Sequence, residues 1–185
     1  MSHRIFIAIN FPEDTKRKLV EIQQKWAKLP VHWTKKASLH FTLVFLGYMD
    51  DGGIWEVCKI TKKVASLHQP FFINFKKVLL GPPNRPPRMI WVEGEKSAEL
   101  AKLKQDLENF LSSGKSIDYQ PESRAFSPHL TLARIRTSEW RSLQSPPKIE
   151  ENVSLSFAVN SIEVMESRLL RDGAEYTVLE SAELG

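Results

Sequence analysis

The feature that most constrains the fold of this chain is a four-residue pattern that occurs twice. The segments His40–Leu43 (HFTL) and His129–Leu132 (HLTL) share a histidine, an apolar residue, a threonine and a leucine. Both lie in short, strongly apolar stretches that are typical of β-strands. The two histidines are 89 residues apart in a chain of 185 residues. This spacing predicts two structurally similar lobes, each built around one copy of the pattern.

Within each copy, the histidine and the threonine are expected to point the same way. Side chains alternate across a β-strand, so residues two positions apart share a face. His40 and Thr42 should therefore project together, as should His129 and Thr131, while the residues between them face a hydrophobic core. If the two strands lie side by side about a pseudo-twofold axis, the two pairs face each other across a groove.

The rest of the chain predicts an α+β fold with mainly antiparallel sheets, because strands and helices alternate irregularly and hairpins occur among them. Gly47 is expected to end the first motif strand, and the proline-rich segment 81–87 to form a hairpin tip. Strands are expected at 5–10, 31–34, 39–46, 71–80, 88–93, 130–135, 153–166 and 174–179, helices at 12–28, 54–67 and 97–111, and a turn at Arg171-Asp172-Gly173. No linker is long enough to separate independent domains, so residues 1–185 are predicted to form a single two-lobed domain.

Composition narrows the choice of partner. The chain has 26 Lys and Arg against 22 Asp and Glu, with a pI near 9.2, which suits an anionic ligand such as RNA. A mildly basic protein without such a ligand is the simpler alternative. Cys58 is the single cysteine, so no disulfide framework or cysteine-based zinc site is possible. Signal-peptide features are absent and no apolar run reaches the ~18 residues that cross a bilayer, so we expect a cytoplasmic protein.

The chemistry available to the two motifs is proton transfer. Neither motif has a carboxylate or a third histidine at metal-ligand spacing, and Ser38 and Ser127 lack the glycine-flanked turn of a nucleophilic serine. Imidazole has an unperturbed pKa near 6.5, so one ring can be neutral and the other charged at neutral pH. The neutral ring accepts a proton from water and the charged ring gives one to a departing alkoxide. In-line attack at phosphorus puts these events on opposite sides, which favours phosphoester chemistry.

With both motifs, the chain resembles the two-histidine (2H) phosphoesterases, specifically the bacterial RNA 2′,3′-cyclic phosphodiesterases, historically named 2′-5′ RNA ligases. Further support comes from segments 4–9 (RIFIAI), 88–92 (RMIWV) and 126–128 (FSP), and from Tyr176. The resemblance covers essentially the whole chain. It implies two pseudo-symmetric α+β lobes around a central groove, with helices on the outer faces.

The resemblance also implies an enzyme that opens a 2′,3′-cyclic phosphate at an RNA end to leave a 2′-phosphate, with no metal and no cofactor. The 3′ oxygen then leaves, so His40 would be the proton donor and His129 the proton acceptor that activates water. The sequence alone does not fix which histidine takes which role. Thr42 and Thr131 would bind the non-bridging oxygens of the phosphate.

Further substrate-binding candidates lie near the motifs. Arg134 fits the pattern H-x-T-L-x-R, but its odd separation from His129 places it on the histidine face only if a bulge or the strand end brings it there. The aromatic rings of Phe11, Phe45, Trp91 and Phe126 are candidates for stacking on a terminal base, with core packing as the alternative. Basic residues that would steer RNA are Lys35, Lys36, Arg134, Arg136 and Arg141.

Other functions remain open from the sequence. The same site could join RNA ends through a 2′-5′ linkage, which is the reverse reaction. A catalytically silent RNA- or nucleotide-binding module is a second class, although a binder does not need both histidines and both threonines. Hydrolysis of a small cyclic nucleotide or of an ADP-ribose cyclic phosphate is a third. We expect a monomer that binds no membrane, and the sequence does not reveal the physiological RNA.

Overall fold

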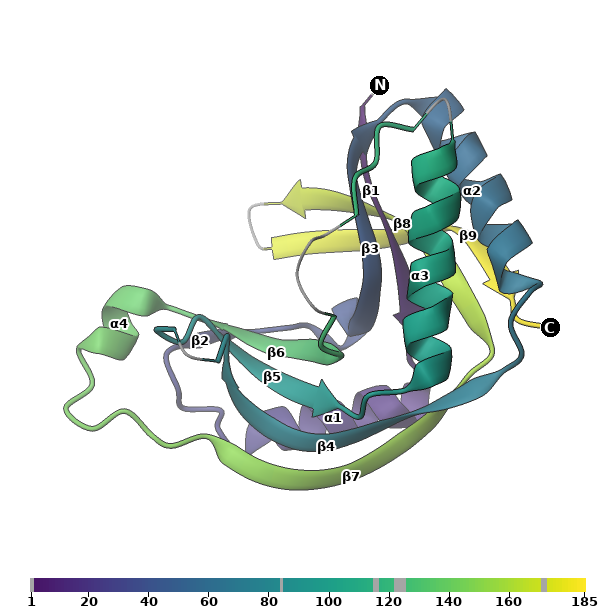
Figure 1. Ribbon diagram of the computed structural model, residues 1–185. Coiled ribbons are helices and arrows are strands. Elements are labelled where there is room, and N and C mark those ends of the chain that lie inside the picture. Colours follow the sequence, from purple (N-terminus) through teal and green to yellow (C-terminus); the bar gives the residue numbers. More distant parts are fainter. Residues whose placement is uncertain (1, 84, 115–116, 122–125, 171–172) are drawn as a thin grey trace.

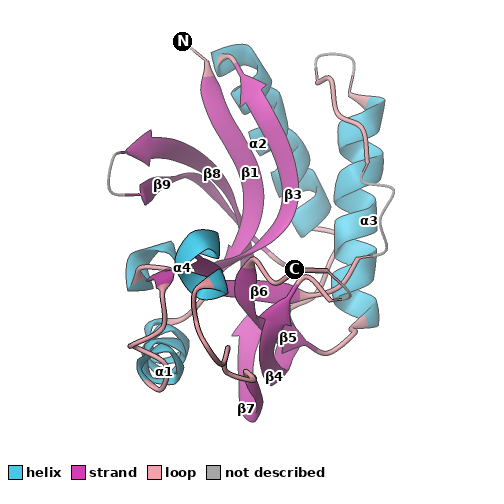
Figure 2. Ribbon diagram, turned by 90° about the vertical axis from the view of Figure 1, so that its left-hand side faces the viewer, coloured by secondary structure: helices cyan, strands magenta, loops and turns pink. Residues whose placement is uncertain are grey.

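The computed structural model describes residues 2–83, 85–114, 117–121, 126–170 and 173–185. Positions 171 and 172 of the expected turn, and Asn84 of the proline-rich segment, lie outside the described residues. The described strands form two antiparallel sheets that meet at an angle, with two long helices beside the upper sheet and one helix behind the lower sheet (Figure 1). Figure 2 shows the same arrangement from the side. The expected α+β class with antiparallel pairing is confirmed.

Each motif lies in a different sheet. The first sheet has the order β3 (His40–Met49), β1 (His3–Asn10), β8 (Ser161–Leu170) and β9 (Gly173–Glu183). The second has the order β2 (Val31–Trp33), β6 (His129–Ile135), β5 (Met89–Gly94), β4 (Phe71–Gly81) and β7 (Glu150–Val159). The strands β3 and β6, which carry the motifs, contact each other where the two sheets meet.

Two of the described helices begin where a side chain accepts a hydrogen bond from a free backbone N–H group. The described helices are α1 (Glu13–Gln24), η1 (Lys36–Ser38, a 3₁₀ turn), α2 (Asp51–Ala65), α3 (Ala98–Ser113) and the unpredicted α4 (Thr137–Arg141). Asp50 accepts a hydrogen bond from the N–H of Gly53 at the start of α2, and Ser97 accepts one from Leu100 at the start of α3. The first helix ends at Gln24, four residues before the expected position, and turns follow it.

Two expectations about strands were wrong. Residues 153–166 do not form one strand, because Asn160 separates β7 from β8 and the two strands belong to different sheets. The apolar alternation changes phase at this position, from Leu155, Phe157 and Val159 to Ile162 and Val164, and Asn160 is a residue type that favours turns, so the sequence does carry a sign of the change. Gly47 does not end its strand either. It has φ of 80° inside β3, at an irregularity in the pairing with β1, and β3 continues to Met49.

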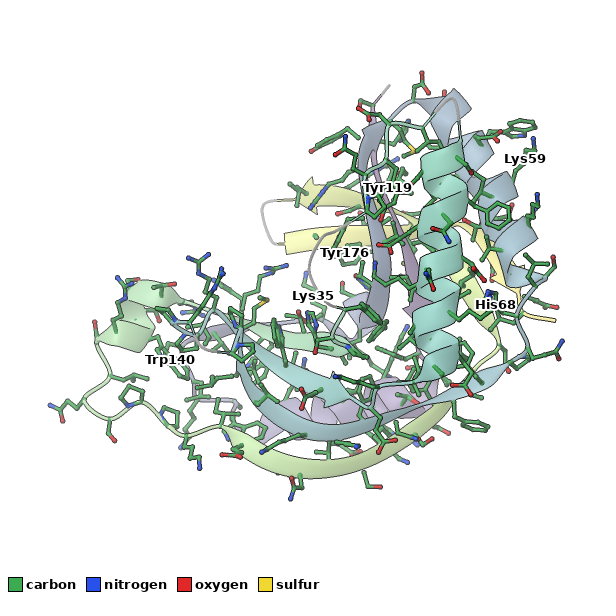
Figure 3. All side chains as sticks on the ribbon, in the orientation of Figure 1. Lys35, Lys59, His68, Tyr119, Trp140 and Tyr176 are labelled. Carbon is green, nitrogen blue, oxygen red and sulfur yellow. The ribbon has the colours of Figure 1, made fainter. Side chains whose placement is uncertain are left out.

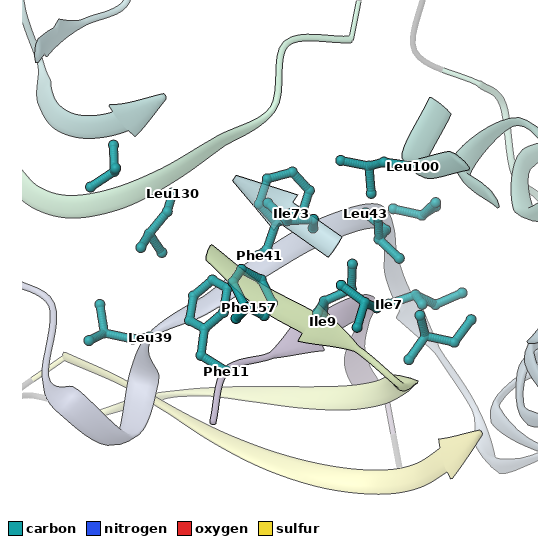
Figure 4. Packing of buried hydrophobic residues seen from close by; sticks show 14 of the residues in the cluster. Ile7, Ile9, Phe11, Leu39, Phe41, Leu43, Ile73, Leu100, Leu130 and Phe157 are labelled. Atoms are coloured by element: carbon teal, nitrogen blue, oxygen red, sulfur yellow. The ribbon is translucent and has the colours of Figure 1, made fainter. Parts of the chain in front are cut away.

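The hydrophobic core draws on both sheets and on the helices (Figure 4). Ile7, Ile9, Phe41 and Leu43 come from the first sheet, Ile73, Leu130 and Phe157 from the second, and Leu100 from α3. A smaller cluster of Phe6, Ala8 and Met165, with Tyr176 packed against it, lies apart from this core. The first sheet therefore buries one set of side chains in the main core, and a second set forms a separate apolar layer. No helix of the described part of the chain is long and apolar enough to cross a membrane.

Candidate active site

Both motif strands alternate between buried and partly exposed side chains. In β3, Phe41 and Leu43 are buried, whereas His40 and Thr42 are partly exposed. In β6, Leu130 and Leu132 are buried, whereas His129 and Thr131 are partly exposed, so burial repeats at the same four positions. This agrees with the alternation expected from the sequence. Each histidine therefore shares a face with its threonine.

A bulge follows the threonine in both strands. In β3, Thr42 pairs with Ala8 and Val44 pairs with Ile7, so Leu43 is the extra residue. The two adjacent residues Leu43 and Val44 are both buried. A bulge of this kind shifts the alternation by one position. Phe45, which pairs with Phe6, consequently returns to the face that carries His40.

The bulge in β6 lies at the equivalent position. Thr131 pairs with Trp91 and Ala133 pairs with Ile90, so Leu132 is the extra residue, and Leu132 and Ala133 are both buried. The next residue, Arg134, is exposed. It pairs with the residue two positions before Trp91, which places it on the face of Trp91 and therefore of His129 and Thr131. The bulge left open by the sequence is present, and Arg134 shares the histidine face.

The ring of His129 is held from two sides. Its Nδ1 donates a hydrogen bond to the backbone oxygen of Ser127 at 2.8 Å, and a carbonyl oxygen can only accept. In the neutral ring, Nε2 is then the unprotonated nitrogen. The indole of Trp91 stacks on the imidazole, with 4.0 Å between ring centroids and 30° between ring planes. Trp91 was a candidate for stacking on a base, but this face of its ring contacts His129 instead.

Gly81 provides the space for that indole. A Cβ at Gly81 would lie 2.3 Å from Cδ2 of Trp91, which is far inside van der Waals contact. Gly81 pairs with Met89 in the β4–β5 hairpin. The sulfur of Met89 in turn accepts from the indole N–H of Trp91 at 3.4 Å and from the hydroxyl of Thr131 at 3.7 Å. These contacts connect the hairpin to both polar residues of the second motif.

The ring of His40 lies among aromatic side chains. Its centroid is 5.0 Å from that of Phe6 and 4.7 Å from that of Tyr176, which meets it edge-on. Burial lowers the pKa of His40 from 6.5 to about 4; the Ser38 backbone opposes this shift and the charge of Lys16 adds to it. Within the described residues, Nδ1 has no partner with good hydrogen-bond geometry. His40 is therefore a neutral imidazole at neutral pH in the ligand-free protein.

This pKa makes the stability of the protein depend on pH. The folded pKa of His40 is about 4, so between that value and 6.5 the unfolded chain binds the proton more strongly and the free energy of unfolding falls as pH falls. From pH 7 to pH 5 the expected loss is about 2 kcal/mol. Urea unfolding of the wild type and of His40→Asn at pH 7 and at pH 5 measures this loss in the free energy of unfolding. An equal loss in both proteins would show that His40 does not cause it.

The remaining aromatic candidates divide between core and surface. Phe11 is buried edge-on against Phe75 and Phe157, so its expected contact with a base is not supported by its position. Phe126 packs edge-on against Phe41 of the core, and the Lys104 ammonium lies 5.4 Å from its ring centroid. Phe45, in contrast, is 60% exposed on the histidine face. Its neighbour Phe6 was not singled out in the sequence, because an unbroken apolar strand does not reveal which residues face the site.

The basic residues differ in whether they form an ion pair within the described part of the chain. Lys36 is paired with Glu13, and Arg136 is paired with Glu139 at 3.0 Å, whereas Arg134 forms no ion pair with another described residue. Figure 3 shows Lys35 and Tyr176 on the side of the molecule between the two sheets, and β9 contacts η1 there. In the described part of the chain, no three His, Cys, Asp or Glu side chains gather closely enough to bind a metal ion.

Known proteins resemble this chain in sequence and in fold. Residues 9–91, which include the first motif and end before the second, match the family described as LigT-like phosphoesterase. A Bacillus subtilis protein named RNA 2′,3′-cyclic phosphodiesterase is 30% identical over 136 residues, which is 72% of each chain. This chain belongs to the LigT-like phosphoesterases. The expected family is confirmed.

Other relatives extend the match to the full length of this LigT-like phosphoesterase. A Methanocaldococcus jannaschii protein, also named RNA 2′,3′-cyclic phosphodiesterase, is 25% identical over 179 residues, covering 95% of this chain and 98% of its own. The crystal structure of a Thermus thermophilus protein superposes with a TM-score of 0.85 at 25% identity, covering 98% of this chain and 97% of its own. Escherichia coli LigT complexed with 3′-AMP shares the fold, with a TM-score of 0.79 at 21% identity, and covers 100% of this chain and 99% of its own.

Proposed function

We propose that this phosphoesterase opens 2′,3′-cyclic phosphates at RNA ends and leaves a 2′-phosphate. The observation that carries the proposal is the repeated arrangement of the two motif strands. Each presents a histidine and a threonine on its less buried face, followed by the same bulge and a further residue that returns to that face. The relatives that carry the name RNA 2′,3′-cyclic phosphodiesterase support the substrate. Residues 1–185 act as one two-lobed domain in this proposal.

In the proposed reaction, His129 accepts a proton from water and His40 gives one to the departing 3′ oxygen. The unprotonated Nε2 that the Ser127 hydrogen bond leaves on His129 suits an acceptor. The low pKa of ligand-free His40 taken alone favours the opposite assignment. A phosphodiester anion bound beside the ring opposes the effect of burial, because a nearby negative charge raises the pKa of an imidazole. His40 thus becomes a donor when the substrate is bound.

The other residues bind the substrate. Thr42 and Thr131 donate hydroxyl hydrogen bonds to the non-bridging oxygens of the phosphate. Arg134, which is exposed and shares the face of His129, balances the negative charge that develops there. Phe45 is the platform for the terminal base, and Phe126 packs against Phe41 of the core. The reaction requires no metal ion and no cofactor.

The roles of the two histidines are separable with a better leaving group. A substrate with sulfur in place of the 3′ oxygen expels a thiolate, which needs little protonation. His40→Ala should then recover about 10²-fold or more of its lost rate on this substrate, whereas His129→Ala should recover little. Single-turnover rates of both variants on both substrates measure this. Selective recovery of His129→Ala would reverse the assignment.

The product decides between this function and its alternatives. The purified protein is incubated in a chelator with RNA that ends in a 2′,3′-cyclic phosphate, and the product is identified by its resistance or sensitivity to an enzyme that removes only 3′-phosphates. A 2′-phosphate end supports the proposal. A 3′-phosphate end refutes the assigned leaving group, and tight binding without turnover identifies a silent binder. Longer products formed from ends that carry a 5′-hydroxyl would show the reverse ligation.

A further inference from the structure

A cavity of about 510 Å³ lies at the end of the first sheet, between residues of β1, β3 and β8. The residues that matter in its wall are Arg4, Tyr48, Ser167 and Arg168, together with Glu166. None of them belongs to either histidine motif, and the proposed mechanism gives none of them a role.

The cavity continues the face that carries His40. Arg4 lies two positions before Phe6 on β1, so the two side chains share a face. The Phe6 ring is the one that contacts the imidazole of His40 at 5.0 Å. Ser167 pairs with Tyr176, whose ring touches both Phe6 and His40. From Phe6 to Arg4 the strand advances about 7 Å. The cavity therefore begins two residues beyond the Phe6 ring that contacts His40.

The charges in the wall favour an anion. Arg168 is 3.2 Å from Glu166, and Glu166 also accepts a hydrogen bond from His3 at 2.7 Å. Arg168 and His3 therefore already pair with the only carboxylate among the described residues of the wall. Arg4 forms no ion pair with another described residue, so its positive charge remains available to a ligand.

A buried hydroxyl gives an independent indication of a ligand. Ser167 is only 8% exposed, yet its Oγ has no hydrogen-bond partner among the described residues. A buried polar group without a partner is costly, and Ser167 is one of the residues that line the cavity. An anion with several acceptor oxygens would satisfy Ser167 and Arg4 together. Tyr48 (68% exposed) lines the cavity, and Phe45 (60% exposed) lies on the same strand between Tyr48 and the first motif. Both rings offer stacking surfaces for bases.

We propose that this cavity binds a phosphodiester of the RNA strand upstream of the cyclic end. This inference rests on the proposed function and deepens it, since it makes an oligonucleotide the preferred substrate over a mononucleotide. The strand runs from His40 over Phe6 and Phe45 toward Tyr48, and its backbone phosphate meets Arg4 and Ser167. Because contacts go to the backbone and to ring faces, the preference concerns length and not base sequence.

Steady-state kinetics on a series of cyclic-phosphate substrates tests the proposal. The measured quantity is the ratio of kcat/KM for a six-nucleotide RNA to kcat/KM for a nucleoside 2′,3′-cyclic phosphate. We expect the wild-type ratio to exceed about 10, and Arg4→Gln to reduce it about 10-fold, in line with one charge-assisted contact. Arg17→Gln removes the same charge from α1, where Arg17 pairs with Asp14, and should leave the ratio unchanged.

The Ser167→Ala variant distinguishes an effect on RNA binding from an effect on the stability of the fold. Removal of a buried hydroxyl that has no partner among the described residues should leave the Tm unchanged or raise it, while the length ratio falls severalfold. A lowered Tm with an unchanged ratio would indicate a structural role and overturn the proposal. The slope of RNA affinity against salt concentration should also fall by about one in Arg4→Gln.

The proposed function and the upstream site fail in different ways. If no cyclic phosphate of any length is opened, the proposed function fails. If the mononucleotide and the hexanucleotide are opened equally well, or if Arg4→Gln and Arg17→Gln behave alike, only the upstream site is refuted. Inorganic phosphate provides a further test as a competitor. If it lowers the rate on the mononucleotide as strongly as on the hexanucleotide, phosphate binds at the histidine site, and the cavity is contradicted as the phosphate site.

Discussion

His40→Ala and His129→Ala are each expected to lower kcat on a cyclic-phosphate-ended RNA by about 10³-fold, within the range of 10² to 10⁴ typical of one general acid or base. In the proposed mechanism both proton transfers belong to a single displacement at phosphorus, so either histidine alone contributes little to the rate once the other is removed. The double variant should therefore be barely slower than either single one. Single-turnover measurements with excess enzyme determine these rates.

A matched control removes a histidine elsewhere. His68 is buried, follows the end of α2 and bonds to Asp106 of α3 at 2.9 Å. In Figure 3 it lies on the other side of α3 from Tyr176 and Lys35. His68→Asn should lower the Tm but leave kcat unchanged at a temperature where the variant is folded. Wild-type turnover by either motif variant, in protein with an unchanged circular dichroism spectrum, would end the two-histidine mechanism.

Gly81→Ala is expected to reduce both stability and activity, although Gly81 is far from His129 in the sequence. The added methyl group would lie 2.3 Å from the Trp91 ring, so the indole or the hairpin must move. Overpacking of this kind costs about 1–3 kcal/mol. Because the indole stacks on His129, its displacement should also lower kcat, by up to about 100-fold for a shift near 1 Å.

Two comparisons isolate this effect. Gly52→Ala in α2 meets nothing closer than 3.5 Å, so it should be neutral or stabilise the protein by about 0.5–1 kcal/mol. Trp91→Val in the Gly81→Ala background removes the clashing ring, and the two substitutions should therefore cost less together than the sum of their separate costs. Strict additivity in urea unfolding, or full activity of Gly81→Ala, would show that the contact does not position His129.

The comparison of sequence and structure separates local patterns from long-range ones. The alternation of His40 and Thr42 with buried Phe41 was predictable, because period-two burial is a local property of strands. The bulges at Leu43 and Leu132 were not, because a bulge depends on the partner strand. For that reason the sequence left the place of Arg134 open.

Other features of the site depend on contacts that no local pattern contains. The position of Trp91 against His129 requires Gly81 from the neighbouring strand. The low pKa of His40 arises from burial among rings that β1 and β9 supply. Tertiary packing decides both of these. The break at Asn160, where the chain leaves one sheet for the other, is different, because the apolar alternation changes phase between Val159 and Ile162 and the sequence therefore contained the signal.

The central claim is that the two imidazoles act on opposite sides of one phosphorus atom. A crystal structure with a nucleoside 2′,3′-cyclic vanadate, which mimics the five-coordinate transition state, tests it directly. We predict Nε2 of His40 and Nε2 of His129 at about 2.6–3.2 Å from the two opposite apical oxygens. A vanadate bound by one histidine alone, with the other ring directed elsewhere, would contradict it.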